Sequence, residues 1–341
     1  MIASIMMAFT SYLRTLASDM PYSSFFVLAL SYLIVVGGIL TVLKIRMKNN
    51  FQMPWYKEVA VSEVDDDIKG VKIKKEMRFS KLHMLMVFVG GMCEFGISLT
   101  CILAFGLAGD YEINAGIAGI FMPLSSVIVG LASFFFYKEK MQITGIVGMF
   151  VIIGGATLIA MFPAVNDSGD VATTSQILFV LSLSLLATVF LSVEIMVSKT
   201  LAIRGADGRL VGFSFLFVMG IVGSLCLAIS TIAGQGLMVI SMADFWYMMA
   251  GGVCGVTAIS LFQYSISQGS AGIASAIFNT NSAFFTALCF FLLDQALSNW
   301  QITGIVITLL GACFMSINDE VFPCCKDKKN SAQSPEAMDK N

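Results

Sequence analysis

Long apolar runs separated by short polar breaks dominate this sequence of 341 residues. Each run is about 20 residues long, the length that a helix needs to cross a hydrocarbon layer roughly 30 Å thick. Charged residues make up only 12% of the chain, against roughly 25% in soluble domains. The runs are continuous and not alternating, which excludes a membrane β-barrel. We therefore predict an all-α, polytopic helical membrane protein with nine clear spans: 24–43, 82–107, 114–136, 141–162, 177–198, 210–233, 245–267, 271–293 and 300–317.

The start of the chain is ambiguous. Residues 2–16 are apolar, but the segment is short and Arg14 interrupts it. It lacks the basic start and the small-residue cleavage site of a signal peptide. A truncated tenth span and an interfacial helix both fit residues 1–20, so the sequence predicts nine or ten transmembrane helices.

Basic residues lie almost wholly on one side of the predicted membrane. With nine alternating spans, 19 of the 20 Lys and Arg residues fall on the same side, and only Arg14 has no assigned place. Cytosolic loops are enriched in Lys and Arg. This side, which includes loop 44–81 and the C-terminus, is therefore predicted to face the cytosol.

One pattern occurs twice in the chain. AGIA stands at 115–118 and again at 271–274, and QITGIV stands at 142–147 and again at 301–306. The two markers recur in the same order 156 and 159 residues further along the chain, which indicates duplication of a larger unit.

The duplication predicts two repeats. Five spans make up the second repeat, and this odd number turns the two copies upside-down relative to each other, as in secondary transporters. Residues 1–20 stand where the first of the five helices of the first repeat is expected. The predicted domains are a first repeat, a lumenal or extracellular linker, a second repeat and a disordered cytosolic tail: 1–162 (with loop 44–81), 163–176, 177–317 and 318–341.

Four stretches carry a resemblance to a known superfamily. They are Met92–Gly96, the Met122-Pro123 step, the QITGIVG hairpin, and residues 194–213 at the start of the second half. On these the chain resembles the drug/metabolite transporter superfamily (EamA-like), and within it the solute-carrier branch related to nucleotide-sugar transporters. The resemblance covers roughly residues 24–317 and implies a carrier built from two five-helix repeats.

Glu94 is the main functional candidate because it lies midway along the span 82–107. A carboxylate at that depth costs roughly 2.5–3.5 kcal/mol on insertion scales, so it should face the bundle interior or a wet cavity. A substrate-binding or proton-binding role is one interpretation. The other is a structural, protonated glutamate bonded to the backbone or to Ser98.

A polar step interrupts the eighth span, and the repeat places it opposite the proline step of the third span. Paired polar or broken segments at matching positions indicate a midplane site, while hydrogen bonds that only hold helices together are the alternative. Gln263 and Tyr264 would line the path to this site. The predicted substrate-binding residues are therefore Glu94, Met122, Pro123, Ser125, Ser126, Gln263, Tyr264, Asn279, Asn281 and Ser282.

Four further groups of residues have predicted roles. Glu194 and Lys199, near the cytosolic end of the fifth span, form a predicted gate or interfacial ion pair, with a snorkelling lysine as the alternative. Asn166 occupies an N-x-S sequon on the far side and is a predicted glycosylation site. Cys324 and Cys325 follow the last span and fit either palmitoylation or free thiols. Loop 44–81 and the tail fit lipid contact or partner docking.

These observations predict a secondary active transporter for a small organic solute, and not an enzyme. The chain has no Walker motif, no Gly-rich phosphate loop and no nucleophile paired with a base. No cofactor, metal or nucleic-acid partner is expected. The expected partners are membrane lipid and a small solute, with or without a coupled proton, and a homodimer is left open. The alternative function is a non-transporting scaffold or receptor. Either an endomembrane (Golgi, vacuolar or lysosomal) or the plasma membrane fits the chain.

Overall fold

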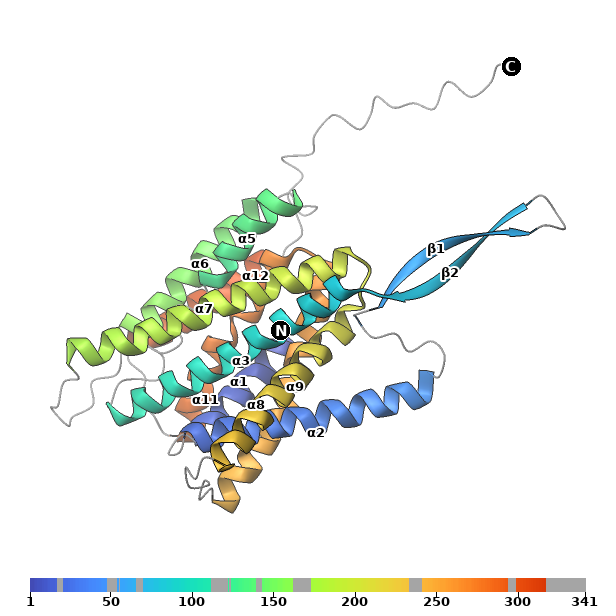
Figure 1. Cartoon of the computed structure of the whole chain (residues 1–341). Coiled ribbons are helices and arrows are strands. Elements are labelled where there is room, and N and C mark those ends of the chain that lie inside the picture. The colour runs from blue at the N-terminus through green and yellow to red at the C-terminus, as the bar shows by residue number, and fades with distance from the viewer. Residues whose placement is uncertain are drawn as a thin grey trace, which may run out of the picture.

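The computed structural model describes residues 1–16, 21–47, 54, 56–65, 70–111, 122, 124–138, 143–161, 173–232, 241–293 and 299–316. As predicted, the apolar segments among them form a helical bundle (Figure 1). Its helices are α1 Ile2–Leu16, α2 Pro21–Met47, α3 Lys81–Asp110, α5 Leu124–Tyr137, α6 Ile143–Met161, α7 Thr174–Ile203, α8 Gly208–Ile232, α9 Met242–Gln268, α10 Ala271–Phe278, α11 Asn281–Leu293 and α12 Asn299–Ser316.

The bundle has an apolar exterior and polar side chains inside. Six of its described helical segments are long and apolar enough to cross a membrane: Phe25–Arg46, Lys81–Ala108, Leu178–Ile203, Gly208–Ile229, Met242–Gln268 and Ala271–Leu292. Phe136 and Phe291 are 77% and 74% exposed, whereas Glu94 and Gln263 are 4% and 0% exposed. A soluble protein would show the opposite distribution. The chain is therefore an integral membrane protein.

Loop 44–81 contains regular structure that was not predicted from the sequence. Strands β1 (Tyr56–Asp65) and β2 (Gly70–Phe79) pair antiparallel, with Tyr56 opposite Phe79 and Asp65 opposite Gly70. The first strand carries three valines, and the second carries one valine and one isoleucine, residue types that favour extended backbone. The hairpin projects away from the bundle at the end where α3 begins (Figure 1). The loop therefore presents a structured element on the side predicted to be cytosolic.

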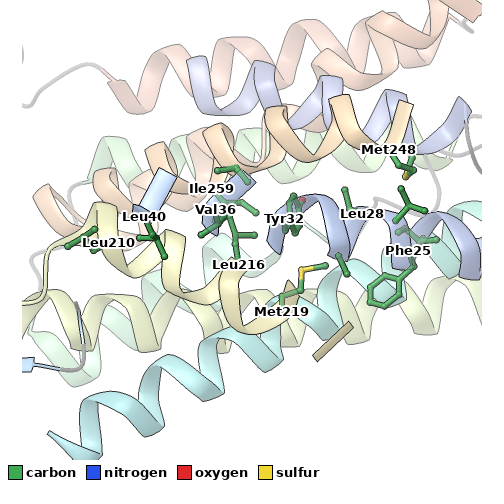
Figure 2. Close-up of a cluster of buried hydrophobic side chains, with 14 residues drawn as sticks. Phe25, Leu28, Tyr32, Val36, Leu40, Leu210, Leu216, Met219, Met248 and Ile259 are labelled. Carbon is green, nitrogen blue, oxygen red and sulfur yellow. The ribbon is translucent and has the colours of Figure 1, made fainter. Parts of the chain in front are cut away.

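The helices pack in a pattern that relates the two halves of the chain. Helix α1 contacts α9 and α11, and α7 contacts α3 and α5. Helix α2 contacts α9, as α8 contacts α3, and α6 contacts α12. The core cluster between α2, α8 and α9 includes Tyr32, Leu216 and Ile259 (Figure 2). Neither half of the chain forms a bundle by itself, since each packs mainly against the other.

The segment 2–16 forms a helix within the bundle. In α1, Ser4, Ala8, Thr10 and Arg14 are buried, and the Ser4 hydroxyl donates to the Ile277 carbonyl of α10 at 2.8 Å. A helix lying at the membrane interface would keep one polar face in water. Of the two interpretations left open by the sequence, the packing of α1 fits the tenth helix.

The predicted eighth span is broken at its polar step. Helix α10 ends at Phe278, α11 begins at Asn281, and a turn joins them. The Ile277 carbonyl accepts from the hydroxyls of Ser4 and Thr280, each at 2.8 Å. Side-chain donors that take up a helix carbonyl compete with the helical hydrogen bond, which is the local reason for the break. In the first half, α5 begins at Leu124, and the predicted start of the third span at 114 lies outside the described residues.

Helices α6 and α12 approach closely at Gly155, and this contact yields a stability prediction. A Cβ at Gly155 would lie 2.7 Å from the Gly304 carbonyl oxygen and collide with Thr308, whereas a Cβ at Gly154 would meet nothing within 4 Å. Overpacking of this kind costs about 1–3 kcal/mol. We expect Gly155→Ala to lower the thermal unfolding midpoint in detergent by several degrees. The matched control, Gly154→Ala, should leave it unchanged, and equal effects of the two variants would contradict a close contact at Gly155.

Candidate functional site

Six buried side chains from five helices form an acidic network in the interior. We use this name for Arg14 (α1), Tyr32 (α2), Glu94 and Ser98 (α3), Glu194 (α7) and Gln263 (α9). Arg14 and Glu94 are 4% exposed, and Glu194 is 1% exposed. Burying three charged groups among apolar helices costs several kcal/mol unless they are paired. Their presence there is the strongest functional signal in the described part of the chain.

Glu94 lies at the centre of this network. Its Oε1 accepts a long hydrogen bond from the Ser98 hydroxyl at 3.4 Å. Its carboxyl group also lies beside the Glu194 carboxyl and is attracted by the charge of Arg14. The sequence placed Glu94 in the interior next to Ser98, and the structure adds Glu194 and Arg14 as its other neighbours.

Glu194 and Gln263 meet across α7 and α9. The Gln263 amide nitrogen donates to Glu194 Oε1 at 2.6 Å. The remaining oxygens, Glu194 Oε2 and Gln263 Oε1, are buried and have no hydrogen-bond donor among the described residues. Lys199, which the sequence grouped with Glu194 as a gate or ion pair, donates to the Gly269 carbonyl oxygen at 2.6 Å. The structure thus places Glu194 in the network.

Arg14 and Tyr32 are the network residues that sequence reasoning left without a role. The guanidinium of Arg14 donates to the Tyr32 hydroxyl at 3.0 Å, and its Nε has no acceptor among the described residues. A basic residue inside an apolar segment is itself a signal, because such residues are costly and usually face a bundle interior. Helix α1 also brings Arg14 beside a helix from the second half of the chain, since it packs along α9.

A second polar group, the serine–asparagine cluster, joins α10 to α5. It consists of Ser125, Ser126, Ser275 and Asn279. The Asn279 amide nitrogen lies 2.9 Å from the hydroxyl oxygens of both Ser125 and Ser126. The structure therefore brings Asn279, in the polar step of the eighth span, into contact with Ser125 and Ser126 of the third span. Ser275 was not among the site residues predicted from the sequence.

The other described candidates lie around these two groups. Tyr264 is half-buried and holds the guanidinium of Arg209 4.5 Å above its ring. The Ser282 hydroxyl donates to the Asn279 carbonyl oxygen at 3.1 Å, and Met122 and Asn281 are half-buried.

Some predictions fall on parts of the chain that the structure does not describe. Pro123, Asn166, Cys324, Cys325 and the tail 318–341 lie outside the described residues. Within the described ranges, no group of three His, Cys, Asp or Glu side chains is placed to hold a metal ion.

An experiment on the serine–asparagine cluster can distinguish a role in helix packing from a role in substrate binding. Because the Asn279 amide donates to protein hydroxyls, we expect Asn279→Ala to act on stability. Hydrogen bonds between membrane helices average about 0.6 kcal/mol and reach about 1.7, so the free energy of unfolding should fall by that amount. The Michaelis constant for transported solute should stay within about twofold of wild type. Ser182→Ala, at an exposed position of α7 where the hydroxyl bonds to its own helix, is the control. A tenfold rise in the Michaelis constant at unchanged stability would instead make Asn279 a substrate ligand.

Comparison with known proteins gives a transporter likeness over part of the chain. No family model matches the sequence. Over 128 residues the chain is 26% identical to an "Uncharacterized transporter" of Clostridium kluyveri, a match covering 37% of this chain and 41% of the relative. The chain thus matches about two fifths of the relative's length. Together with the apolar helices, this likeness indicates a transporter-like membrane protein.

The fold also resembles a solved structure. A chain described only as "Crystal structure of protein" superposes with a TM-score of 0.63 at 15% sequence identity, covering 92% of this chain and 95% of that one. A likeness at this identity concerns the fold alone. Almost the whole bundle therefore has a counterpart of the same architecture in a crystal.

Proposed function

We propose that this chain is a secondary active transporter that moves a small organic solute across a membrane by alternating access. The observation that carries the proposal is the acidic network. Its charged members come from α1 and α3 of the first half and α7 of the second, and Gln263 comes from α9. Buried ionisable residues where two halves meet are typical of solute and proton pathways in membrane proteins. Glu94 is the substrate-binding or proton-binding carboxylate of this proposal.

The packing of the two halves supports inverted repeats at 1–162 and 177–317. When the helices of the two halves are matched in chain order, contacts recur in equivalent pairs: α1 with α9 and α7 with α3, or α2 with α9 and α8 with α3. The two halves also share a short motif, since residues 90–93 read GGMC and 251–254 read GGVC. Gly91 approaches α8 and Gly252 approaches α2. Reciprocal contacts of this kind are what a two-fold relation between repeats produces.

The finer assignments belong to this proposal as well. Membership of the EamA-like superfamily, and a place near its nucleotide-sugar branch, rest on the four motifs and the repeat pattern. Among the Lys and Arg residues with a described side chain, Arg14 is the one that is deeply buried, and the Tyr32 hydroxyl already contacts it. With two carboxyl groups beside it, this interior favours a neutral or cationic solute over a phosphate-bearing one. An endomembrane or plasma-membrane location with a cytosolic C-terminus completes the proposal.

A docking function is the second candidate, and the hairpin β1–β2 is the observation that favours it. It projects from the bundle where a partner could reach it (Figure 1). A scaffold, however, has no need for charged groups buried at the contact between two halves. Removing residues 56–79 separates the two functions, because a carrier should keep its flux and a scaffold should lose its partner.

Reconstitution tests the proposed transport. Purified protein is screened by thermal shift against solute libraries, and the stabilising solute is then measured for uptake into liposomes. We expect flux that saturates with solute concentration and is absent from empty liposomes. A folded, correctly inserted protein that moves no stabilising solute would contradict transport.

A further inference from the structure

Around Glu194 there are more buried hydrogen-bond acceptors than donors. Glu194 Oε1 takes the amide proton of Gln263, while Glu194 Oε2 and Gln263 Oε1 are both buried and have no donor among the described residues. The Glu94 carboxyl, the next neighbour, offers two more oxygens and accepts from Ser98. Buried acceptors without donors are rare in proteins, and each one needs a water, an ion or a ligand to explain it.

The charges of the network are also unbalanced. Arg14 is attracted to Glu94 and is bonded to Tyr32. Electrostatic contacts place Glu194 beside the Glu94 carboxyl and the Gln263 amide, and neither of these brings a positive charge. One guanidinium thus lies near two carboxyl groups, and when both carboxyls are ionised the network lacks one positive charge. In a low-dielectric interior that charge is strongly favoured.

We propose that this place is taken by the primary ammonium group of the transported solute, which donates to Glu194 Oε2 and to Gln263 Oε1. An ammonium group has three N–H donors and one positive charge. Two of the donors satisfy the two orphaned oxygens, and the charge neutralises Glu194. The solute is therefore an amine that is cationic at neutral pH. This inference rests on the proposed transport function and names its substrate class.

The geometry assigns different roles to the two glutamates. Arg14 acts on Glu94, so that carboxyl is compensated within the protein. Glu194 has an unbonded oxygen, and Gln263, which donates to Glu194, has an unbonded amide oxygen as well. Glu194 is accordingly the direct ligand of the ammonium, and Gln263 holds Glu194 in place while contributing its own oxygen.

Matched pairs of amines test the inference. The probes are butylamine and phenethylamine, each compared with its N-acetylated form, which is similar in shape but has lost the positive charge. Binding is followed by thermal shift of the full chain in detergent, and flux of the stabilising amine is measured in liposomes. We expect at least one amine to stabilise the protein and to be transported, while its acetylated form does neither.

Two variants test whether the amine binds at Glu194 and Gln263. Glu194→Gln keeps the shape and removes the charge, and it should weaken amine binding about tenfold to a hundredfold, the loss expected for a charge-assisted hydrogen bond. Gln263→Met removes the second acceptor and should also weaken binding, which keeps a test available if Glu194→Gln fails to fold. The control Glu63→Gln, in β1, removes the same charge from a position outside the bundle and should bind the amine as wild type does.

The outcomes distinguish this inference from the proposed function. If a neutral or anionic solute is transported and none of the amines binds, the ammonium site is wrong and transport stands. If an amine binds equally well to wild type and to Glu194→Gln, the ammonium lies elsewhere and the inference is overturned. If no solute of any class is transported by the folded protein, both proposals fail.

Discussion

Replacing Glu94 with glutamine is expected to reduce solute transport by at least about tenfold. The change keeps the size of the side chain and removes its negative charge at a position that is 4% exposed. Hydrogen bonds to charged groups contribute roughly 1.5–3 kcal/mol, which corresponds to a factor of ten or more in binding or rate. The substitution also leaves Arg14 without the carboxylate that attracts it. Uptake into proteoliposomes, with solute and proton gradients imposed separately, measures the effect.

A control for Glu94 lies one helical turn away. Ser98→Ala removes the 3.4 Å hydrogen bond to Glu94 Oε1 and leaves the charge in place. Because that bond is long, we expect Ser98→Ala to lower transport by no more than about threefold. Wild-type transport by Glu94→Gln would reduce Glu94 to a structural residue. A loss of folded protein in Glu94→Gln alone would have the same meaning, since it would locate the effect in stability.

Replacing Arg14 with methionine is expected to cause the largest loss of stability, about 3–5 kcal/mol. Removing one member of a buried charged group leaves the other charge uncompensated, and this is far more costly than never having the pair. Arg14 is 4% exposed, donates to Tyr32 at 3.0 Å and compensates Glu94. The free energy of unfolding can be measured by titration with denaturing detergent, with helix content as the signal.

A double variant shows whether the loss comes from charge. In Arg14→Met with Glu94→Gln, no uncompensated charge remains at Glu94, so we expect at least half of the lost stability to return. Arg209→Met is the control, because Arg209 is exposed and stacks over Tyr264 at the edge of the bundle. That change should cost about 0.5–1 kcal/mol. If the double variant were as unstable as the sum of the single ones, Arg14 would act through packing of α1 and not through its charge.

The helices could be predicted from the sequence because the cause of each one is local. A backbone in hydrocarbon must satisfy its own polar groups, and an apolar run of about 20 residues can do so only as a helix. The predicted spans 82–107 and 245–267 therefore agree closely with α3 (Lys81–Asp110) and α9 (Met242–Gln268). The hairpin β1–β2 was not predicted, because its pairing is set by strand register between two segments that carry many charges.

The partners in the site could not be predicted in the same way. The polar residues of α3 and α7 indicate which face of each helix turns inward, but not which helix that face meets. Depth in the membrane indicated that Glu94 faces the interior, but not which residues it meets. Gln263 and Glu194 are 69 positions apart and meet only because α7 and α9 pack together.

The sequence alone determined that this chain crosses a membrane as helices, that its pattern is duplicated, and that Glu94 lies within the bilayer. All three follow from the composition of short segments and their spacing along the chain. Only the tertiary structure decided that Arg14 lies in the interior, that Glu194 meets Gln263, and that Asn279 joins Ser125 and Ser126. These contacts depend on the rotation and docking of each helix, which arise from packing among all the helices together.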